Sequence, residues 1–263
     1  MTDASGYSRE ETGRLELIWG NGFLSPGGPG EVARIVGGHD VTGCAVLDIG
    51  SGTGGAAVSL VADHGAGSVV GVDVQAELVA LATSRAEAAG LDGRVRHRVI
   101  VPGPLPFADE SFDVVFSKDA IIHVQDKLAL YAEAFRVLRP GGRLLVGDWL
   151  RGDDGDLTSQ VEAFVDAAGH GFAMASLRET GEIVERAGFA DVELEDRGRW
   201  YLGEAAAELE RLRGELWAEF LFRWGEEAAR AEIEFWEVLV SSLATGALGP
   251  GHVRARKPRS VES

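Results

Sequence analysis

An aspartate followed by glycines at every second position marks one short stretch of this chain, Asp48-Ile49-Gly50-Ser51-Gly52-Thr53-Gly54. The apolar run Val46–Ile49 predicts a buried strand, and the run Ala56–Val61 predicts a helix after the glycines. Glycines at such a turn tolerate positive φ and let a ligand approach the backbone. A second predicted strand, Ser68–Asp73, ends in an acid about 20 residues downstream, where a carboxylate can accept hydrogen bonds from both ribose hydroxyls. The two units together predict a nucleoside site.

The spacing of the glycines distinguishes two classes of nucleoside ligand. Dinucleotide-binding enzymes use G-x-G-x-x-G and place a pyrophosphate at the helix N-terminus. Here the pattern is D-x-G-x-G-x-G, and Asp48 inside the strand would repel a phosphate but could pair with a cationic amino-acid group. A ligand with an adenosine, an ammonium and a sulfonium fits better. The pattern resembles the first motif of class I S-adenosylmethionine-dependent methyltransferases, with Asp73 as the acid of the next motif.

Composition narrows the class of protein and its partners. The 263 residues suffice for one large domain with an elaboration, and a net charge of −17 argues against nucleic-acid partners. Cys44 is the single cysteine, which excludes a disulfide framework and is most simply a small buried hydrophobe. The chain shows neither an apolar run that could span a membrane nor, in the polar Met1–Glu10, a signal peptide. We expect a cytoplasmic enzyme with a small-molecule substrate and no membrane partner; monomer and homo-oligomer both stay open.

Strand and helix patterns alternate from Gly43 to Asp196, which predicts a parallel sheet with helices on both faces. The predicted strands after the first two are Arg94–Val101, Phe112–Phe116, Arg143–Gly147, Val192–Glu195 and His252–Arg256, the last returning antiparallel at the sheet edge. The predicted helices after the first are Gln75–Ala89, Asp126–Leu138, Thr158–Ala168 and Ser176–Ala187. The resulting fold class is α/β, a Rossmann-like, seven-stranded class I methyltransferase sheet.

The segment Gly203–Leu243 interrupts this alternation with a helical pattern. We therefore expect a helical insertion before the last strand. The predicted organisation is an N-terminal helical lid at 1–30, an α/β core that binds S-adenosylmethionine at 31–202, a helical substrate cap at 203–248, and a last strand with a tail at 249–263.

Several further motifs occur in the order found in methyltransferases. Leu105–Asp113 resembles the family's L-P-F-x-D-x-S-F-D signature, and Arg136–Gly142 resembles the helix stop before its fifth strand. Over nearly the whole chain the sequence resembles phosphoethanolamine N-methyltransferases, most specifically in Tyr7–Glu10, Ile18–Gly28 and Ser117–His123.

This resemblance implies roles for individual residues. An N-terminal tyrosine and a histidine after the fourth strand form the family's catalytic pair, which maps to Tyr7 and His123, and the family's substrate-amine aspartate maps to Asp119. Histidine, with a reference pKa of ~6.5, is well suited to accept the proton that an amine must lose. A buried histidine that only packs, and a plain salt bridge at Asp119, remain the structural alternatives. The cofactor contacts that we assign are Leu24, Ser25, Asp48, Gly50, Gly52, Asp73, Val74, Val101, Pro102 and Ser117.

Aromatic residues are the remaining substrate candidates. Trp149 occupies the place of an aromatic substrate contact in the family, and an aromatic face attracts a methylated cationic nitrogen. Trp200 and Tyr201 could complete a cage, whereas Trp19 has helical spacing with Leu15 and is expected in the core.

The sequence departs from the family at two places. The tyrosines and cations that hold phosphate are not found: Asp166, His170 and Phe172 stand near one set of positions, and Glu232, Glu234 and Glu237 stand in the insertion. An acidic lining there would reject a phosphomonoester. The acid that usually accepts the adenine amino group is replaced by Val101 and followed by Pro102, which has no N–H to offer.

Several functions remain open at this stage. We favour transfer of a methyl group to the nitrogen of a small amine. The alternatives are O- or S-methylation of a small natural product or a betaine-type amino-acid metabolite, since Ile18-Trp19-Gly20 also resembles sarcosine/dimethylglycine methyltransferases. A non-catalytic regulator that binds S-adenosylmethionine is the alternative of another class. The six histidines show no metal-ligand spacing, and we expect no metal.

The assignment of Asp73 can be tested directly. Asp73→Ala removes the acceptor for the ribose hydroxyls, so the affinity for S-adenosylhomocysteine, measured by calorimetry, should fall while the protein stays folded. Unchanged affinity would remove Asp73 from the ribose site.

Overall fold

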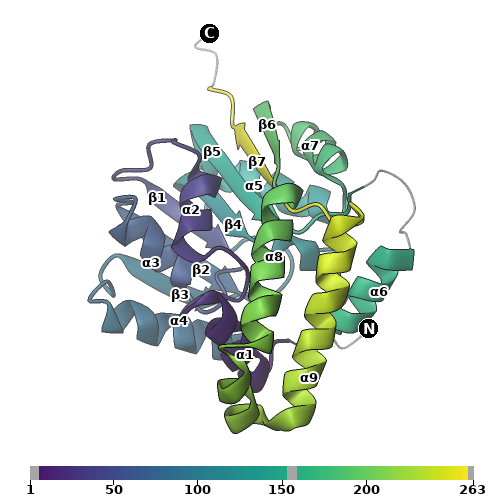
Figure 1. Ribbon diagram of the computed structural model, residues 1–263. Helices are drawn as coiled ribbons and strands as arrows, with labels where there is room; N and C mark the ends of the chain where they lie inside the picture. The colour runs from purple at the N-terminus through teal and green to yellow at the C-terminus, as the bar shows by residue number, and fades with distance from the viewer. Residues whose placement is uncertain (1–5, 153–158, 260–263) are drawn as a thin grey trace.

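The computed structural model describes residues 6–152 and 159–259, and shows one sheet flanked by helices (Figure 1). Seven strands pair in the order β3-β2-β1-β4-β5-β7-β6. The strands are β1 (Ala45–Ile49), β2 (Ser68–Asp73), β3 (Val95–Val99), β4 (Phe112–Lys118), β5 (Leu138–Asp148), β6 (Ala190–Asp196) and β7 (Gly251–Arg256). β1 to β5 pair in parallel, and β7 is antiparallel to both of its neighbours. This is the predicted class of fold.

Apolar side chains on both faces of the sheet explain why helices cover both. On one face β1, β2 and β4 pack through Val46, Val69 and Val114 against helices α2 (Gly28–Val36) and α3 (Gly55–Ala62). Helix α4 (Ala76–Ala88) joins them on that side. On the other face Leu47 and Val115 pack in a cluster that includes side chains of α5 (Lys127–Val137) and α7 (Leu177–Arg186). The near-continuous apolar strands are those of a sheet buried on both sides.

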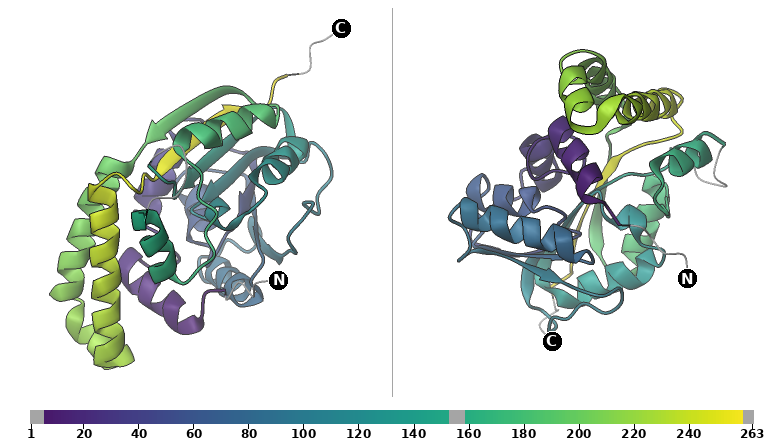
Figure 2. Two further views of the ribbon diagram at one scale, coloured as in Figure 1. Left: turned by 90° about the vertical axis from the view of Figure 1, so that its right-hand side faces the viewer. Right: turned by 90° about the horizontal axis from the view of Figure 1, so that it is seen from below.

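A separate group of helices forms a third core beyond the sheet. It consists of α1 (Arg9–Trp19), α6 (Ser159–Ala168), α8 (Gly198–Arg213) and α9 (Trp217–Ala244). Figure 2 shows α8 and α9 side by side as a hairpin, with α1 and α6 beside it. Gly225, with φ 85°, interrupts α9. The predicted lid and insertion therefore share one hydrophobic core.

The structure corrects several details of the sequence prediction. The last strand does not lie at the sheet edge: β7 lies between β5 and β6, because its backbone pairs on both sides. The insertion begins with α8 at Gly198, before the predicted Gly203. β5 begins directly after α5, because Leu138 already pairs with Phe112 and a register shift accommodates the turn at Pro140.

None of the helices in the described part of the chain has the length and apolar composition needed to cross a bilayer.

The turn after β1 requires glycine for two separate reasons. Gly50 has φ 72°, in the left-handed region that favours glycine. A Cβ at this position would also overlap the methyl group of Ala120, next to Asp119. The absence of a side chain at Gly50 thus lets two strand ends approach each other.

A matched pair of substitutions separates these two reasons. Gly43 has the same φ of 72° but open space where a Cβ would lie, so Gly43→Ala introduces only backbone strain. Gly50→Ala also introduces the steric overlap with Ala120 and should lower the free energy of unfolding by about 1–3 kcal/mol more than Gly43→Ala. Denaturant titration of both variants measures this difference, and equal losses would contradict the steric argument.

Candidate active site

Two cavities meet beyond the carboxyl ends of the parallel strands. The larger has a volume of about 1170 Å³ and extends along the glycine turn and the ends of β2 and β4. The smaller, of about 320 Å³, extends toward α6 and α9. Both are lined by Tyr7, Leu24, Ser25, Asp119, His123 and His170. These shared residues form the junction at which molecules in the two cavities would touch.

The larger cavity collects almost all of the residues predicted to bind the cofactor. Its lining includes Leu24, Ser25, Asp48, Gly50, Gly52, Asp73, Val74, Val101 and Pro102. Ser117 is the exception: it is fully buried, is not part of this lining, and its hydroxyl donates to the carbonyl of Ile49 at 2.8 Å. In the structure Ser117 joins the ends of β1 and β4.

Two carboxylates at the glycine turn have different surroundings. Asp73 accepts hydrogen bonds from the backbone N–H groups of Gly52 at 2.9 Å and Gln75 at 3.0 Å. It thus braces the loop as well as facing the cavity, so Asp73→Ala should also loosen the turn. Asp48 is fully buried, its Oδ2 has no hydrogen-bond partner among the described residues, and burial with nearby Asp73 raises its pKa to about 7. Of the two carboxylates, Asp48 has the stronger requirement for a bound ligand, because a buried carboxylate oxygen needs a hydrogen-bond donor.

Tyr7 and His123 come together as predicted, although they lie far apart in sequence. The Tyr7 hydroxyl is 3.4 Å from His123 Nε2. The Tyr7 N–H donates to Oε1 of Gln75 at 3.1 Å, which fixes the residue that precedes α1 against the start of α4. His123 ends the 3-10 turn Ile121–His123. Lys127 Nζ donates to the carbonyls of Ile121 and Val124, which hold that turn in place.

Burial sets the protonation state of this pair. Burial lowers the pKa of His123 to about 4, with smaller contributions from nearby His170 and Lys127. Burial raises the pKa of Tyr7 well above its ordinary value, and nearby carboxylates raise it further. At neutral pH both side chains are therefore uncharged. This corrects the expectation that the His123 pKa lies near its reference value, because a buried imidazole without an anionic partner resists protonation.

A second histidine lies beside the pair and was not assigned a role from the sequence. The His170 ring lies 4.6 Å from the Tyr7 ring and 6.0 Å from the His123 ring, and its Nε2 lies 2.8 Å from Oε1 of Glu11. From the sequence, His170 stood out only as a departure from the family pattern. Its position could not be read from spacing, since it depends on the segment between β5 and α7 packing against α1.

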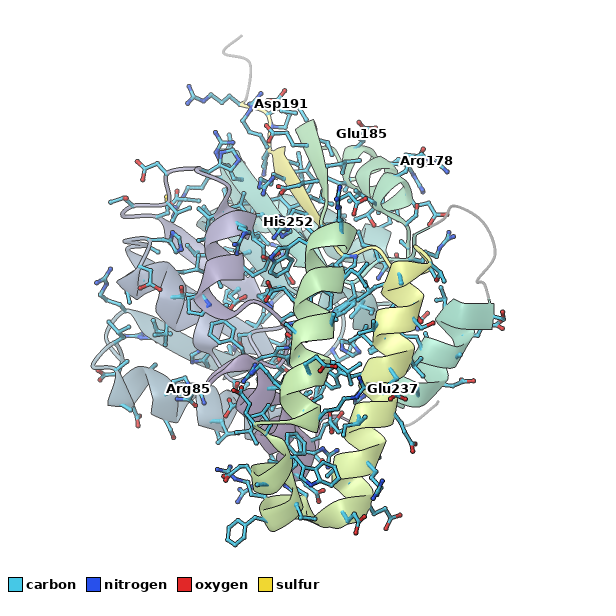
Figure 3. The ribbon with its side chains drawn as sticks, in the orientation of Figure 1. Arg85, Arg178, Glu185, Asp191, Glu237 and His252 are labelled. Carbon is cyan, nitrogen blue, oxygen red and sulfur yellow. The ribbon has the colours of Figure 1, made fainter. Side chains whose placement is uncertain are left out.

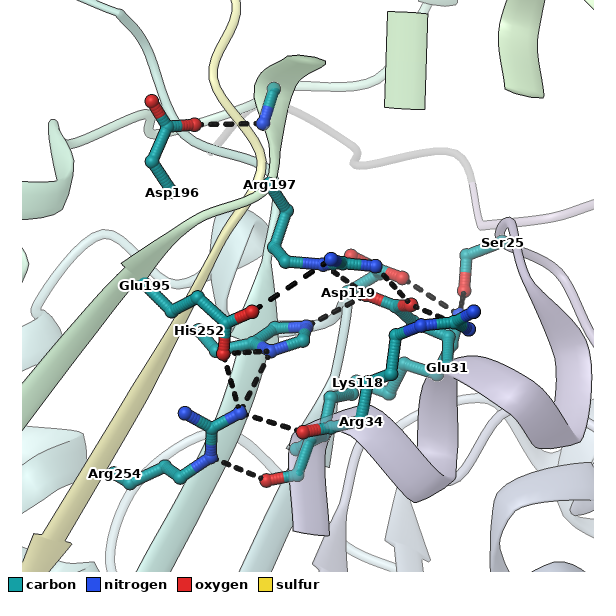
Figure 4. Close-up of polar contacts among 12 residues, drawn as sticks. Ser25, Glu31, Arg34, Lys118, Asp119, Glu195, Asp196, Arg197, His252 and Arg254 are labelled. Carbon is teal, nitrogen blue, oxygen red and sulfur yellow. Dashed lines mark hydrogen bonds and ion pairs between the residues drawn. The ribbon is translucent and has the colours of Figure 1, made fainter. Parts of the chain in front are cut away.

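Lys118, the last residue of β4, contacts both the following Asp119 and Ser25 (Figure 4). Lys118 Nζ donates to Asp119 Oδ2 at 2.8 Å and also to the hydroxyl of Ser25 in the lid. Asp119 has φ 54°, a left-handed conformation that is uncommon outside glycine. The salt bridge considered for Asp119 is thus present, and Lys118 is a site residue that we did not single out. Its place directly before Asp119, at the end of a buried strand, was the available signal.

A buried polar network connects α2 with β7 and with the start of α8 (Figure 4). His252 Nε2 donates to Glu31 at 2.7 Å, and His252 Nδ1 accepts from Arg254 at 3.1 Å. Arg197 donates to Glu31 at 3.1 Å and stacks over Trp200 at 4.3 Å. These contacts join α2, β7 and the start of α8 behind the lid.

The aromatic candidates divide between two places. Trp149 lines the smaller of the two main cavities, as predicted. Trp200 and Tyr201 do not; they line a separate space of about 20 Å³ behind Asp119, where Tyr201 is fully buried and Trp200 is covered by Arg197. Trp19 packs between two cores, as expected, but also lines the smaller cavity.

The predicted acidic lining is partly wrong. Glu232 lines the smaller cavity, where its Oε2 is 3.0 Å from Nε of Arg14 and burial raises its pKa to about 7. Glu234 and Glu237 are exposed, because they lie on the other side of α9. Glu237, which Figure 3 labels on α9, pairs with Arg213 at 2.6 Å. Among the described residues no group of His, Cys, Asp and Glu is arranged to hold a metal ion.

Glu208 anchors α1 to the helical hairpin of α8 and α9. Its carboxylate accepts hydrogen bonds from Trp19 Nε1 at 2.8 Å, Trp236 Nε1 at 3.1 Å and the Tyr201 hydroxyl at 3.3 Å. Burial raises its pKa to about 7 in spite of these donors. One carboxylate thus connects α1, α8 and α9, and nothing in the local sequence pattern of α8 distinguished it.

Known proteins resemble this chain both in sequence and in structure. Residues 47–146 match the family model described as "Methyltransferase domain". The structure of phosphoethanolamine N-methyltransferase 2 from Haemonchus contortus, in complex with phosphomonomethylethanolamine and S-adenosylhomocysteine, superposes with a TM-score of 0.86 at 30% identity. That match covers 95% of this chain and 58% of the other. The chain thus has the fold of the class I methyltransferases, and residues 47–146 resemble a methyltransferase domain.

Several curated proteins similar to this chain are phosphoethanolamine N-methyltransferases. The Arabidopsis thaliana enzyme 1 is 33% identical over 203 residues, which cover 77% of this chain and 40% of that protein. The Caenorhabditis elegans enzyme 2 is 31% identical over 84% of this chain and 51% of that protein. The chain spans about half the length of the curated relatives it matches.

The anchor at Glu208 predicts a pH dependence of stability. With a folded pKa of about 7 against an ordinary value of 4.5, the folded methyltransferase domain keeps a proton between these values that the unfolded chain has released. The contribution of Glu208 to the free energy of unfolding therefore falls as the pH rises from about 5 to 7. Glu208→Gln cannot titrate, so its melting temperature should fall less between pH 5 and pH 8 than that of the wild type. Glu210→Gln, exposed on the same helix, is the control and should follow the wild type. Parallel curves for Glu208→Gln and the wild type would contradict the assignment.

Proposed function

We propose that the chain is an S-adenosylmethionine-dependent methyltransferase that methylates the nitrogen of a small amine. The observation that carries this proposal is the junction of the two cavities, where Tyr7, His123 and Asp119 line both. A methyl donor in one cavity and an amine in the other would meet beside the groups that handle a proton. The relatives named above support the type of reaction.

The larger cavity fits S-adenosylmethionine by its own chemistry. The unpartnered Oδ2 of Asp48 suits the ammonium of the amino-acid part, and Asp73 keeps lone pairs for ribose hydroxyls after its two backbone contacts. Gly50, which has no Cβ to meet Ala120, lines the cavity with its backbone. Val101, which is largely exposed, and Pro102 offer the adenine an apolar surface without a carboxylate. When bound, the sulfonium supplies an electrophilic methyl carbon.

The residues at the junction can prepare an amine for attack. Asp119 attracts the ammonium form and orients the nitrogen toward the larger cavity, which supplies the alignment that in-line displacement needs. Because His123 is neutral, its Nε2 can accept the Tyr7 proton while the Tyr7 oxygen accepts one from the amine. Tyrosinate never has to form, in keeping with the raised pKa of Tyr7. The proton thus moves to His123 as the nitrogen gains its methyl group.

The role of the Tyr7 hydroxyl group in proton transfer can be tested by substitution. Tyr7→Phe keeps the ring but removes the proton relay, so kcat measured by release of S-adenosylhomocysteine from an amine panel should fall about 10²- to 10⁴-fold. Calorimetric affinity for S-adenosylhomocysteine should change little, because the Gln75 contact uses the Tyr7 backbone.

Tyr131→Phe is the matched control. The Tyr131 hydroxyl is buried and has no hydrogen-bond partner among the described residues, so its removal should leave kcat near the wild-type value. Wild-type kcat in Tyr7→Phe would overturn the relay. No turnover of any amine by a wild-type protein that binds S-adenosylhomocysteine would overturn the proposed activity.

A further inference from the structure

The smaller cavity has a continuous aromatic wall that leads to the junction. Phe164 stacks with Phe172 at 5.9 Å between ring centres and packs against Trp149 at 5.9 Å and Phe235 at 5.7 Å. Phe172 in turn lies 5.1 Å from the His123 ring. All of these rings line the cavity, and none carries a hydroxyl. A substrate held here would bury its non-reacting end against carbon.

The charges of this cavity are already paired within the protein. Arg14 is the single Arg or Lys in the described lining, and it lies 3.0 Å from Glu232 and 2.7 Å from Glu10. His170 is paired with Glu11 at 2.8 Å. Three carboxylates, those of Glu11, Asp119 and Glu232, face the same space. A phosphate group would find Arg14 already paired with two carboxylates, and the described lining offers it no other Arg or Lys.

We propose that the acceptor is an amine whose non-reacting end is apolar and carries no phosphate, and that Glu232 sets this preference by neutralising Arg14. The proposal rests on the proposed function, because it takes the amine nitrogen to lie at the junction beside Asp119. Selectivity then has an attractive part, the aromatic wall, and a repulsive part, the acids around Arg14.

Three primary amines that share one reacting end provide the test: 2-phenylethylamine, ethanolamine and phosphoethanolamine. Their kcat/KM is measured at pH 8, where Glu232 is ionised, and their affinity for the complex with S-adenosylhomocysteine is measured by calorimetry. We expect 2-phenylethylamine to exceed phosphoethanolamine at least tenfold in both. A preference for phosphoethanolamine in either measurement would overturn the proposal.

Glu232→Gln tests the repulsive part. It removes the charge that neutralises Arg14, so the ratio of kcat/KM for phosphoethanolamine to that for 2-phenylethylamine should rise at least tenfold. Glu234→Gln, exposed on the same helix, is the matched control and should keep the wild-type ratio. An unchanged ratio in a folded Glu232→Gln protein would remove Glu232 as the specificity determinant.

Phe164→Leu tests the attractive part in case Glu232→Gln does not fold. Loss of the central ring should lower kcat/KM for 2-phenylethylamine at least fivefold more than for ethanolamine, and equal losses would contradict an apolar tail on this wall. Calorimetry with S-adenosylhomocysteine alone separates the two levels of failure. If S-adenosylhomocysteine does not bind, the proposed function itself is wrong. If it binds and phosphoethanolamine is the preferred substrate, only the inference about the substrate is wrong.

Discussion

Parallel pairing of β1 with β2 and β4 is the constraint on which the site depends. In this register Asp48 stands beside Gly71 and Phe116, so Asp48, Asp73 and Asp119 all reach the same edge of the sheet. The chain can turn there because Gly50 has no side chain to meet Ala120. Three acids and a bare backbone at one edge favour a ligand with hydroxyls and positive charge over one with phosphate.

Burial, more than any ion pair, determines the chemistry of the junction. It keeps His123 unprotonated and Tyr7 protonated, which leaves a neutral donor and a neutral acceptor 3.4 Å apart. Lys118 balances Asp119 in the same layer and also reaches the lid through Ser25. One lysine therefore connects Ser25, ahead of α2, with Asp119 after the end of β4.

The helical core around α1, α8 and α9 decides the shape of the smaller cavity. Glu208 joins these helices through two tryptophans and a tyrosine, and this fixes Trp19 and α1 at the cavity wall. The fold is shared with the phosphoethanolamine N-methyltransferase of Haemonchus contortus along most of this chain.

The sequence alone identified three segments of the candidate site: the glycine turn, Asp73 and the motif from Ser117 to His123. Each is a local pattern that can be recognised from a few neighbouring residues. It also indicated Tyr7, through resemblance. It did not reveal Lys118, the pairing of His170 with Glu11, or Glu208. It also did not reveal that five of the residues it singled out lie outside the lining of the two main cavities: Ser117, Trp200, Tyr201, Glu234 and Glu237. Those outcomes depend on how α1, α8 and α9 pack against the sheet. Helical periodicity says that a face is buried, but only the tertiary structure decides which partner buries it.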